Sequence, residues 1–111
     1  MDEQKKVQSG WSREGKAFQM FVEEVDRNVG EAEKVLELGN KTDPKLQNDV
    51  CIHFHQTKGV AGMFGLDDVA KAAAALEEAF GGELASILAN NIEVNNLLQQ
   101  IKISMQEIKD A

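Results

Sequence analysis

The sequence predicts an all-α protein, an antiparallel up-down-up-down four-helix bundle with a loose N-terminal tail. Its 111 residues include one Pro, no Tyr and 5% aromatic residues against 42% hydrophobic ones, a composition typical of helical domains. Apolar residues recur every three or four positions over long segments, which is the period of an amphipathic helix. Short breaks separate these segments, and short connections join helices that run antiparallel.

The N-terminal end is polar and shows little periodicity. We interpret residues 1–11 as a flexible tail and residues 12–111 as the bundle, with Ser12 as a candidate N-cap. The single Trp, Trp11, either closes the end of the bundle or lies at an interface, and the first is expected because a lone aromatic residue usually serves packing.

The first helix is predicted from about Arg13 to Leu38, and Gly39 provides its C-terminal stop. Its buried stripe is expected to comprise Phe18, Phe21, Val22, Val25, Val29, Ala32, Val35 and Leu36.

The second helix starts at Asp43-Pro44, an N-cap acid followed by proline at the first helical position, and runs to about Phe64. Gly65 ends it, and Leu66 is the hydrophobic contact that follows such a cap. The core stripe reads Leu46, Val50, Phe54, Thr57, Ala61 and Phe64.

Asp67 is the predicted N-cap of a third helix over about Asp68–Phe80, which Gly81-Gly82 ends. A fourth helix is predicted from about Glu83 to Lys109. Its asparagines near position 91 are weak helix formers, so a kink is expected there. The expected inside positions are Leu84, Ile87 with Leu88, Ile92, Val94 with Asn95, Leu98, Ile101, Met105 and Ile108.

The charge and the cysteine content exclude several classes of function. A formal net charge of −7 argues against a general nucleic-acid or anionic-membrane partner. The single cysteine, Cys51, allows no internal disulfide and is typical of a reducing compartment. We find no signal-peptide core and no apolar run long enough to span a bilayer. The expectation is a cytoplasmic protein without a small-molecule substrate.

One face of the second helix carries an unusual set of residues. His55, Lys58, Gly59 and Gly62 fall at i, i+3, i+4 and i+7, which places them together. Each interior glycine costs a helix roughly 1 kcal/mol relative to alanine. The two glycines either admit a neighbouring helix or let another protein reach the imidazole.

A count of residues from the turn predicts a partner for His55. Leu66 is the centre of the turn, and His55 and Glu77 each lie eleven residues from it. In an antiparallel pair with a rise of ~1.5 Å per residue, these two residues reach the same height. Glu77 can then accept a hydrogen bond from Nδ1–H and leave Nε2 free. Glu78 is the competing candidate for this partner, but it lies one residue away from the height of His55 and about 100° round the helix from Glu77.

A free and oriented imidazole can attack a phosphoryl group and hold it as a phosphoimidazole. Lys58, one turn from His55, is placed to supply positive charge to the phosphoryl oxygens. The sequence has no phosphate loop and no kinase signature, so the donor and the acceptor would be other proteins. We expect no cofactor, and Mg²⁺ only on a partner that carries an acceptor aspartate.

These residues resemble a known family, the histidine phosphotransfer (HPt) domain, and are most similar to the N-terminal domain of chemotaxis histidine kinases. The likeness covers about residues 18–80. It rests on three stretches, His55-Gln56-Thr57-Lys58-Gly59, Ala61-Gly62-Met63-Phe64-Gly65 and Leu76-Glu77, and extends to Phe18 through Leu38, whose pattern is similar to the first helix of that family. It implies a phosphocarrier without kinase activity of its own, in a two-component phosphorelay. Its partners would be a histidine kinase, a response-regulator receiver domain, or both.

The resemblance also implies roles for single residues. His55 would be the phosphoacceptor, Lys58 and Gly59 would shape the site, and Glu77 would orient the ring. Two positions depart from the family: Thr57 stands where leucine is usual, and Ala74 stands where chemotaxis kinases often carry a second histidine.

Two other functions remain open from the residues. Cys51 and His55 at i, i+4 can chelate zinc with Glu77 as a third ligand, although no fourth ligand is evident and Lys58 would repel the ion. The bundle could also bind a partner helix without phosphoryl chemistry. His53 lies about 200° round the helix from His55, and we interpret it as structural or merely exposed.

Overall fold

The computed structural model describes residues 15–110, which are helical almost throughout. The predicted tail 1–11, Ser12 and Trp11 lie outside this part of the chain. The described residues contain no strand, which confirms the all-α class. In chain order the elements are α1 (Lys16–Leu38), a 3-10 turn η2 (Gly39–Lys41), α2 (Pro44–Met63), α3 (Asp67–Phe80), α4 (Leu84–Ala89) and α5 (Asn91–Asp110).

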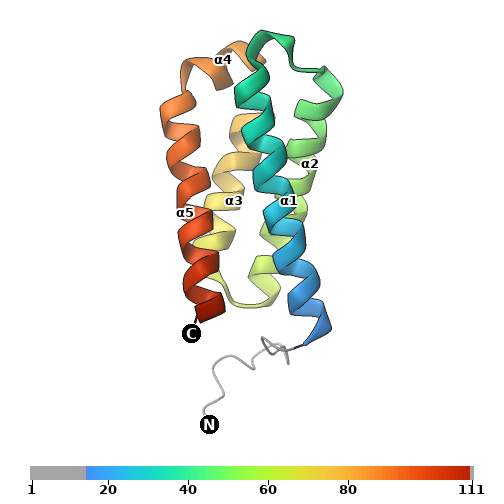
Figure 1. Cartoon of the computed structure of the whole chain (residues 1–111), viewed down its shortest axis with the longest axis vertical. Coiled ribbons are helices and arrows are strands. Elements are labelled where there is room, and N and C mark those ends of the chain that lie inside the picture. Colours follow the sequence, from blue (N-terminus) through green and yellow to red (C-terminus); the bar gives the residue numbers. More distant parts are fainter. Residues whose placement is uncertain (1–14, 111) are drawn as a thin grey trace.

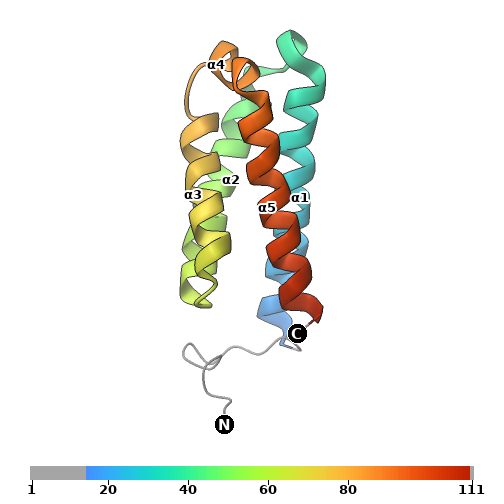
Figure 2. The ribbon, with the colours of Figure 1, turned by 90° about the vertical axis from the view of Figure 1, so that its left-hand side faces the viewer.

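The four long helices lie side by side along one axis. Figure 1 shows α1 and α3 running in one direction, α2 and α5 in the other, and the short α4 at one end. In the perpendicular view, α2 and α3 form one side of the bundle and α1 and α5 the other (Figure 2). The turn at residues 64–66 joins α2 to α3, and these two helices share the most extensive contact.

The predicted helix 83–109 is interrupted, so the described part has five α-helices instead of four. The break lies at Asn90, whose side-chain amide donates to the carbonyl of Ser86 at 2.9 Å. Such local bonds compete with the helical backbone and make asparagine a weak helix former. The predicted kink is therefore a full interruption between α4 and α5.

This break also explains an error in the predicted core. Ile92 was expected inside but is 74% exposed. Because α5 restarts after Asn90, its buried stripe runs through Val94, Leu98, Ile101 and Met105. Ile92 precedes Val94 by two positions, which turns its side chain about 200° away from that stripe.

The beginning of α1 and that of α3 differ from prediction by a few residues. Gly15 has an extended backbone (φ −73°, ψ 154°), so α1 begins at Lys16 and not near Arg13. The N-cap of α3 is Leu66 with no side-chain cap, and Asp67 belongs to the first turn. An acid there still interacts favourably with the helix dipole.

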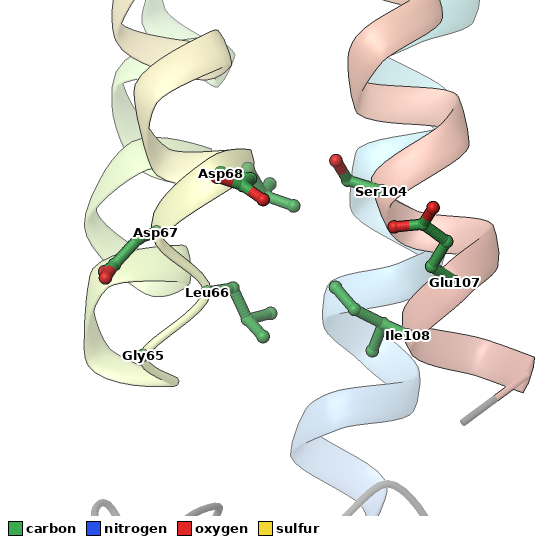
Figure 3. A pocket seen from close by; sticks show the side chains of 8 residues that line it. Gly65, Leu66, Asp67, Asp68, Ser104, Glu107 and Ile108 are labelled. Carbon is green, nitrogen blue, oxygen red and sulfur yellow. The ribbon is translucent and has the colours of Figure 1, made fainter.

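The other helix ends follow the predicted signals. Asp43 caps α2 by accepting a hydrogen bond from the amide of Lys45 at 2.9 Å. At the opposite end Gly65 has a φ of 76°, and Leu66 donates to the carbonyl of Ala61 at 2.9 Å. This Schellman arrangement turns the chain sharply into α3 (Figure 3).

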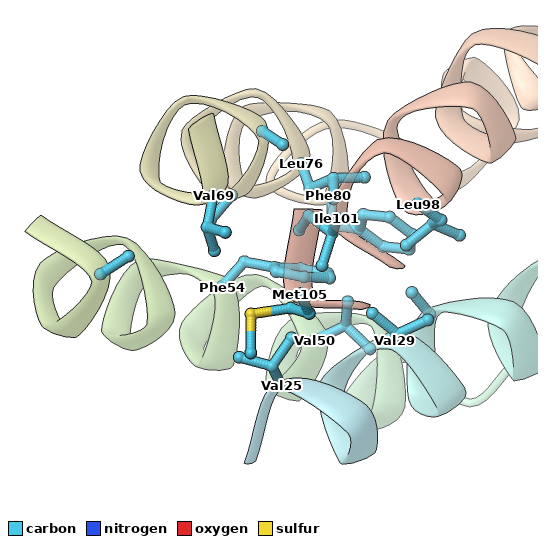
Figure 4. Packing of buried hydrophobic residues seen from close by; sticks show 14 of the residues in the cluster. Val25, Val29, Val50, Phe54, Val69, Leu76, Phe80, Leu98, Ile101 and Met105 are labelled. Carbon is cyan, nitrogen blue, oxygen red and sulfur yellow. The ribbon is translucent and has the colours of Figure 1, made fainter. Parts of the chain in front are cut away.

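The core runs the length of the bundle and receives side chains from every α-helix. The rings of Phe54 and Phe80 pack with their centroids 6.2 Å apart. Figure 4 shows them among aliphatic side chains of α1, α2, α3 and α5. Phe54 and Leu76 are fully buried, so their chain neighbours His55 and Glu77 are held at the edge of the α2–α3 contact.

Candidate functional site around His55

His55 lies on the outer side of α2, and its side chain is 65% exposed. The preceding residue, Phe54, is fully buried. Successive residues on a helix are about 100° apart, so a buried Phe54 fixes the direction in which His55 leaves the helix. The imidazole is therefore held near the surface by the packing directly behind it.

Glu77 on α3 joins His55 and Lys58 through its two carboxylate oxygens. Oε2 lies 2.9 Å from Nδ1 of His55, and Oε1 lies 2.8 Å from Nζ of Lys58. The predicted contact between His55 and Glu77 is thus present. The contact to Lys58 was not predicted, because the helical period places that lysine only relative to His55 and not relative to α3.

The charges around Glu77 keep its carboxylate ionised. The hydrogen bond from Lys58 is the largest cause that lowers the pKa of Glu77 below its ordinary value. The hydrogen bond from His55 and the charges of both partners act in the same direction, while burial opposes them. An ionised carboxylate only accepts hydrogen bonds, so Nδ1 of His55 is the donor. The neutral ring therefore carries its lone pair on Nε2.

The two glycines of this face lie in open space. A Cβ added to Gly59 or Gly62 would meet no heavy atom within 4 Å. The interpretation that they admit a neighbouring helix of this bundle is therefore wrong for the part of the chain that the structure describes. Their backbone is left accessible beside His55.

Exposed apolar side chains flank these glycines along α2. Ile52 is 45% exposed and Met63 is 67% exposed. With His55, Gly59 and Gly62 they recur at three and four positions, which is one side of a helix. We call these five residues the His55 face.

His53 faces the opposite neighbour of α2. Its Nδ1 lies 3.0 Å from Oε1 of Glu31 on α1, and its side chain is half-buried. Its carbonyl accepts a hydrogen bond from the side-chain amide of Asn28 at 3.3 Å. His53 is thus a structural residue of the α1–α2 contact, as one of its two interpretations predicted.

Asn28 and Thr57 form a buried polar pair that was not predicted from the sequence. The Asn28 amide donates to the Thr57 hydroxyl at 2.6 Å, and both residues are buried. Asn28 lies between Val25 and Val29 on the apolar side of α1, and Thr57 interrupts the apolar stripe of α2. One polar residue in each of two facing stripes was a signal that could have suggested the pair.

The geometry does not support the alternative in which Cys51, His55 and Glu77 bind zinc. The Cys51 thiol donates to the main-chain carbonyl of Glu77 at 3.4 Å. Burial, and then the charge of Glu77, raises the pKa of this thiol, which opposes the thiolate that a metal needs. Among residues 15–110, no group of three or more His, Cys, Asp or Glu side chains is arranged to hold a metal ion.

A family model described as the Hpt domain matches residues 16–111. Neither the curated proteins nor the solved structures include one that matches this chain. Within residues 15–110, no helix is both long enough and apolar enough to cross a membrane.

Proposed function

This chain belongs to the Hpt domain family, and we propose that His55 is the residue that accepts and passes on the phosphoryl group. The donor would be a histidine kinase or a phospho-aspartyl receiver domain, and the acceptor a receiver aspartate. The observation that carries this proposal is the exposed imidazole of His55 with Nδ1 paired to Glu77 at 2.9 Å.

In the proposed step, the Nε2 lone pair attacks the phosphorus of a phosphoaspartate. The P–N bond forms as the P–O bond breaks, and the aspartate carboxylate leaves with the electron pair. The Nδ1 proton stays in place, so the phosphorylated ring becomes cationic beside the Glu77 carboxylate. Transfer to a second aspartate reverses these changes.

Lys58 is the proposed source of positive charge for the phosphoryl oxygens. Its Nζ is held 2.8 Å from Glu77, and the side chain remains 39% exposed. Phosphoryl transfer depends chiefly on positioning and on charge at the equatorial oxygens, which an ammonium can supply without forming a bond. Glu77 would therefore place both the nucleophile and the cation.

The His55 face is the proposed docking surface for the receiver domain. Gly59 and Gly62 leave room for a protein surface to approach the imidazole, and Ile52 and Met63 offer apolar contacts on either side. A partner that brings Mg²⁺ and an aspartate would complete the site. Since the sequence contains no nucleotide-binding motif, the chain would act as a carrier and not as a kinase. We place this exchange in the cytoplasm.

Transfer of label from a receiver domain tests the assignment. A receiver phosphorylated at its aspartate with radioactive phosphate is mixed with wild-type chain, His55→Gln and His53→Gln in the presence of Mg²⁺. We expect label on the wild type and on His53→Gln, and none on His55→Gln. His53→Gln is a matched control, since it removes a second imidazole of the same helix that is also paired to a glutamate.

The outcomes of this labelling experiment distinguish phosphoryl transfer through His55 from the alternative functions. Wild-type labelling of His55→Gln would reject His55 as the acceptor. A wild-type chain that binds the phosphorylated receiver without taking up label would favour a bundle that serves only as an interaction module.

A further inference from the structure

The solvent side of α5 carries a second stripe of regularly spaced residues, opposite to the buried one. Ile92, Asn96, Gln99 and Ile103 follow one another at four, three and four positions. Each of them precedes a residue of the buried stripe by two positions, which directs it about 200° away from the core. All four are exposed, and both isoleucines are more than half exposed. We call these four residues the outer stripe.

The outer stripe lies on a part of α5 that has no charge. Residues 94–101 contain no charged side chain, although the chain has a formal net charge of −7. Two copies of so acidic a protein repel each other wherever their charged faces meet, so an uncharged face is where they approach most easily. The spacing of four, three and four positions is also the one at which two helices pack side by side. The outer stripe therefore suits another helix.

The outer stripe is complementary to itself. It has an isoleucine at each end and two amide residues in the middle. When two copies of α5 pack antiparallel about a point between Leu97 and Leu98, Ile92 of each copy lies opposite Ile103 of the other. Asn96 then lies opposite Gln99, and side-chain amides can both donate and accept hydrogen bonds. A two-fold symmetric interface requires this kind of self-complementary surface.

Lys71 on α3 adds a positive charge beside the outer stripe. It lines a hollow of about 310 Å³ between α3 and α5, together with Asp68, Gln100, Ile103 and Ser104. Figure 3 shows Asp68 and Ser104 on the facing sides of α3 and α5. Lys71 is exposed and forms no ion pair within residues 15–110. It balances the charge of Asp68, so the hollow can receive a further carboxylate.

Glu93 is the carboxylate that a second copy brings to this hollow. It is exposed and, within the same residues, also forms no ion pair. It precedes Gln100 by seven positions, so both lie on the side of α5 that faces the hollow. In the antiparallel pair, Glu93 of one copy comes within about 3 Å of the level of Gln100 in the other. In a parallel pair the two levels differ by about 10 Å.

From these observations we infer that two copies of this chain associate through the outer stripe, with α5 antiparallel to α5 and Glu93 of each copy next to Lys71 of the other. One helix face gives a small interface, so the dimer is weak and exchanges with the monomer. Both α2 and α5 pack against α1 and α3, which places α5 diagonally across the bundle from α2 (Figure 2). The His55 face stays open in both copies, and the inference does not depend on the proposed function.

Sedimentation velocity of the full chain, from micromolar to millimolar concentration, tests this association. We expect a monomer–dimer equilibrium in the wild type. Ile103→Lys should raise the dissociation constant at least about tenfold, because each dimer buries this residue twice. Met20→Lys is the matched control, since it places the same charge on an exposed apolar residue of α1, away from the outer stripe. His55→Gln should associate as the wild type does, which keeps this test separate from that of phosphoryl transfer.

Exchange of the two charges tests the antiparallel arrangement. Glu93→Lys and Lys71→Glu should each weaken self-association, because each creates two contacts between like charges. An equimolar mixture of the two variants should form a heterodimer more tightly than either variant pairs with itself, since both contacts then join opposite charges. Circular dichroism establishes that each variant remains helical.

Three results would overturn the inference. The first is a wild-type chain that stays monomeric up to millimolar concentration. The second is a folded Ile103→Lys variant that dimerises as well as Met20→Lys does. The third is a mixture of the two charge variants that associates no more tightly than each variant alone.

Discussion

The side-chain amide of Asn28 on α1 donates a 2.6 Å hydrogen bond to the hydroxyl of Thr57 on α2, in the interior of the bundle. The same amide reaches the carbonyl of His53 at 3.3 Å, so it binds two consecutive turns of α2. Thr57 lies two positions after His55. The pair therefore helps to set the rotation of the helix that carries the imidazole.

The Asn28–Thr57 pair should behave as a unit when it is mutated. Thr57→Leu alone leaves a buried amide without its hydroxyl partner, and we expect a loss of about 1–3 kcal/mol in the free energy of unfolding. Asn28→Leu should cost a similar amount. The double variant removes both polar groups and should recover most of the loss, as urea titrations of the three variants would reveal. Strictly additive losses would show that the two side chains are not coupled.

The pKa of Glu77 should depend more on Lys58 than on His55. NMR titration of the side-chain carboxyl should give a value below the ordinary one, and Lys58→Met should raise it more than His55→Gln does, because the Lys58 hydrogen bond is the largest cause of the shift. The reverse order would contradict this ranking.

The lowered pKa of Glu77 also has a consequence for stability. A carboxyl group whose folded pKa is depressed contributes stability above its unfolded pKa, and this contribution disappears as the pH falls through the folded value. The stability that wild type has over Glu77→Gln should therefore be present just above about pH 4.5 and shrink below it. A stability difference that grows as the pH falls below this value would contradict the predicted sign of the Glu77 contribution.

Replacing Glu77 with alanine should slow phosphoryl transfer about 10- to 100-fold without abolishing it, because the carboxylate orients the ring but does not attack. The transfer rate from a phosphorylated receiver measures this effect. Glu78→Ala is the control, since it removes an exposed carboxylate at the next position of the same helix. Equal rates in the two variants would remove the role of Glu77.

Lys58→Ala should slow transfer about tenfold, as expected when one charge is removed from the phosphoryl oxygens. Its effect on the free energy of unfolding should stay within about 1 kcal/mol, because the ion pair with Glu77 lies at the surface. Lys45→Ala is a suitable control, since it removes a lysine that pairs with Asp49 on the same helix. A large fall in melting temperature for Lys58→Ala would show that this lysine supports the fold.

The bond formed on His55 should be labile to acid and stable to base, as a phosphoimidazole is. Labelled chain is incubated briefly at low and at high pH, and the retained phosphate is counted. Phosphoserine has the opposite behaviour and serves as the reference. Label that survives mild acid would place the phosphate on another residue type.

The sequence alone sufficed to predict the contact between His55 and Glu77 because its geometry follows from one tight turn. Gly65 fixes that turn, and Phe54 and Leu76 are core residues on the two helices that it joins. Equal counts from Leu66 then bring His55 and Glu77 together. No property of α1 or α5 enters this argument, so errors elsewhere in the predicted bundle do not affect it.

Features that depend on contacts between distant helices were not predictable in the same way. The pair His53–Glu31 and the pair Asn28–Thr57 require the rotation of α1 relative to α2, which the period of a single helix does not give. Ile92 was misplaced because the phase of α5 is reset at Asn90. A kink was expected there, but the apolar period continued across that position in the sequence and did not reveal that the helix restarts with a different phase.

The open backbone at Gly59 and Gly62 sets an evolutionary trade-off for this helix. Alanine would fit at both positions without steric conflict and would favour the helix by up to about 1 kcal/mol each. Selection for a more heat-resistant chain would thus tend to replace the two residues. Selection for the proposed phosphoryl exchange with a receiver domain would retain them. The variant with the most stable helix would then exchange the proposed phosphoryl group less readily.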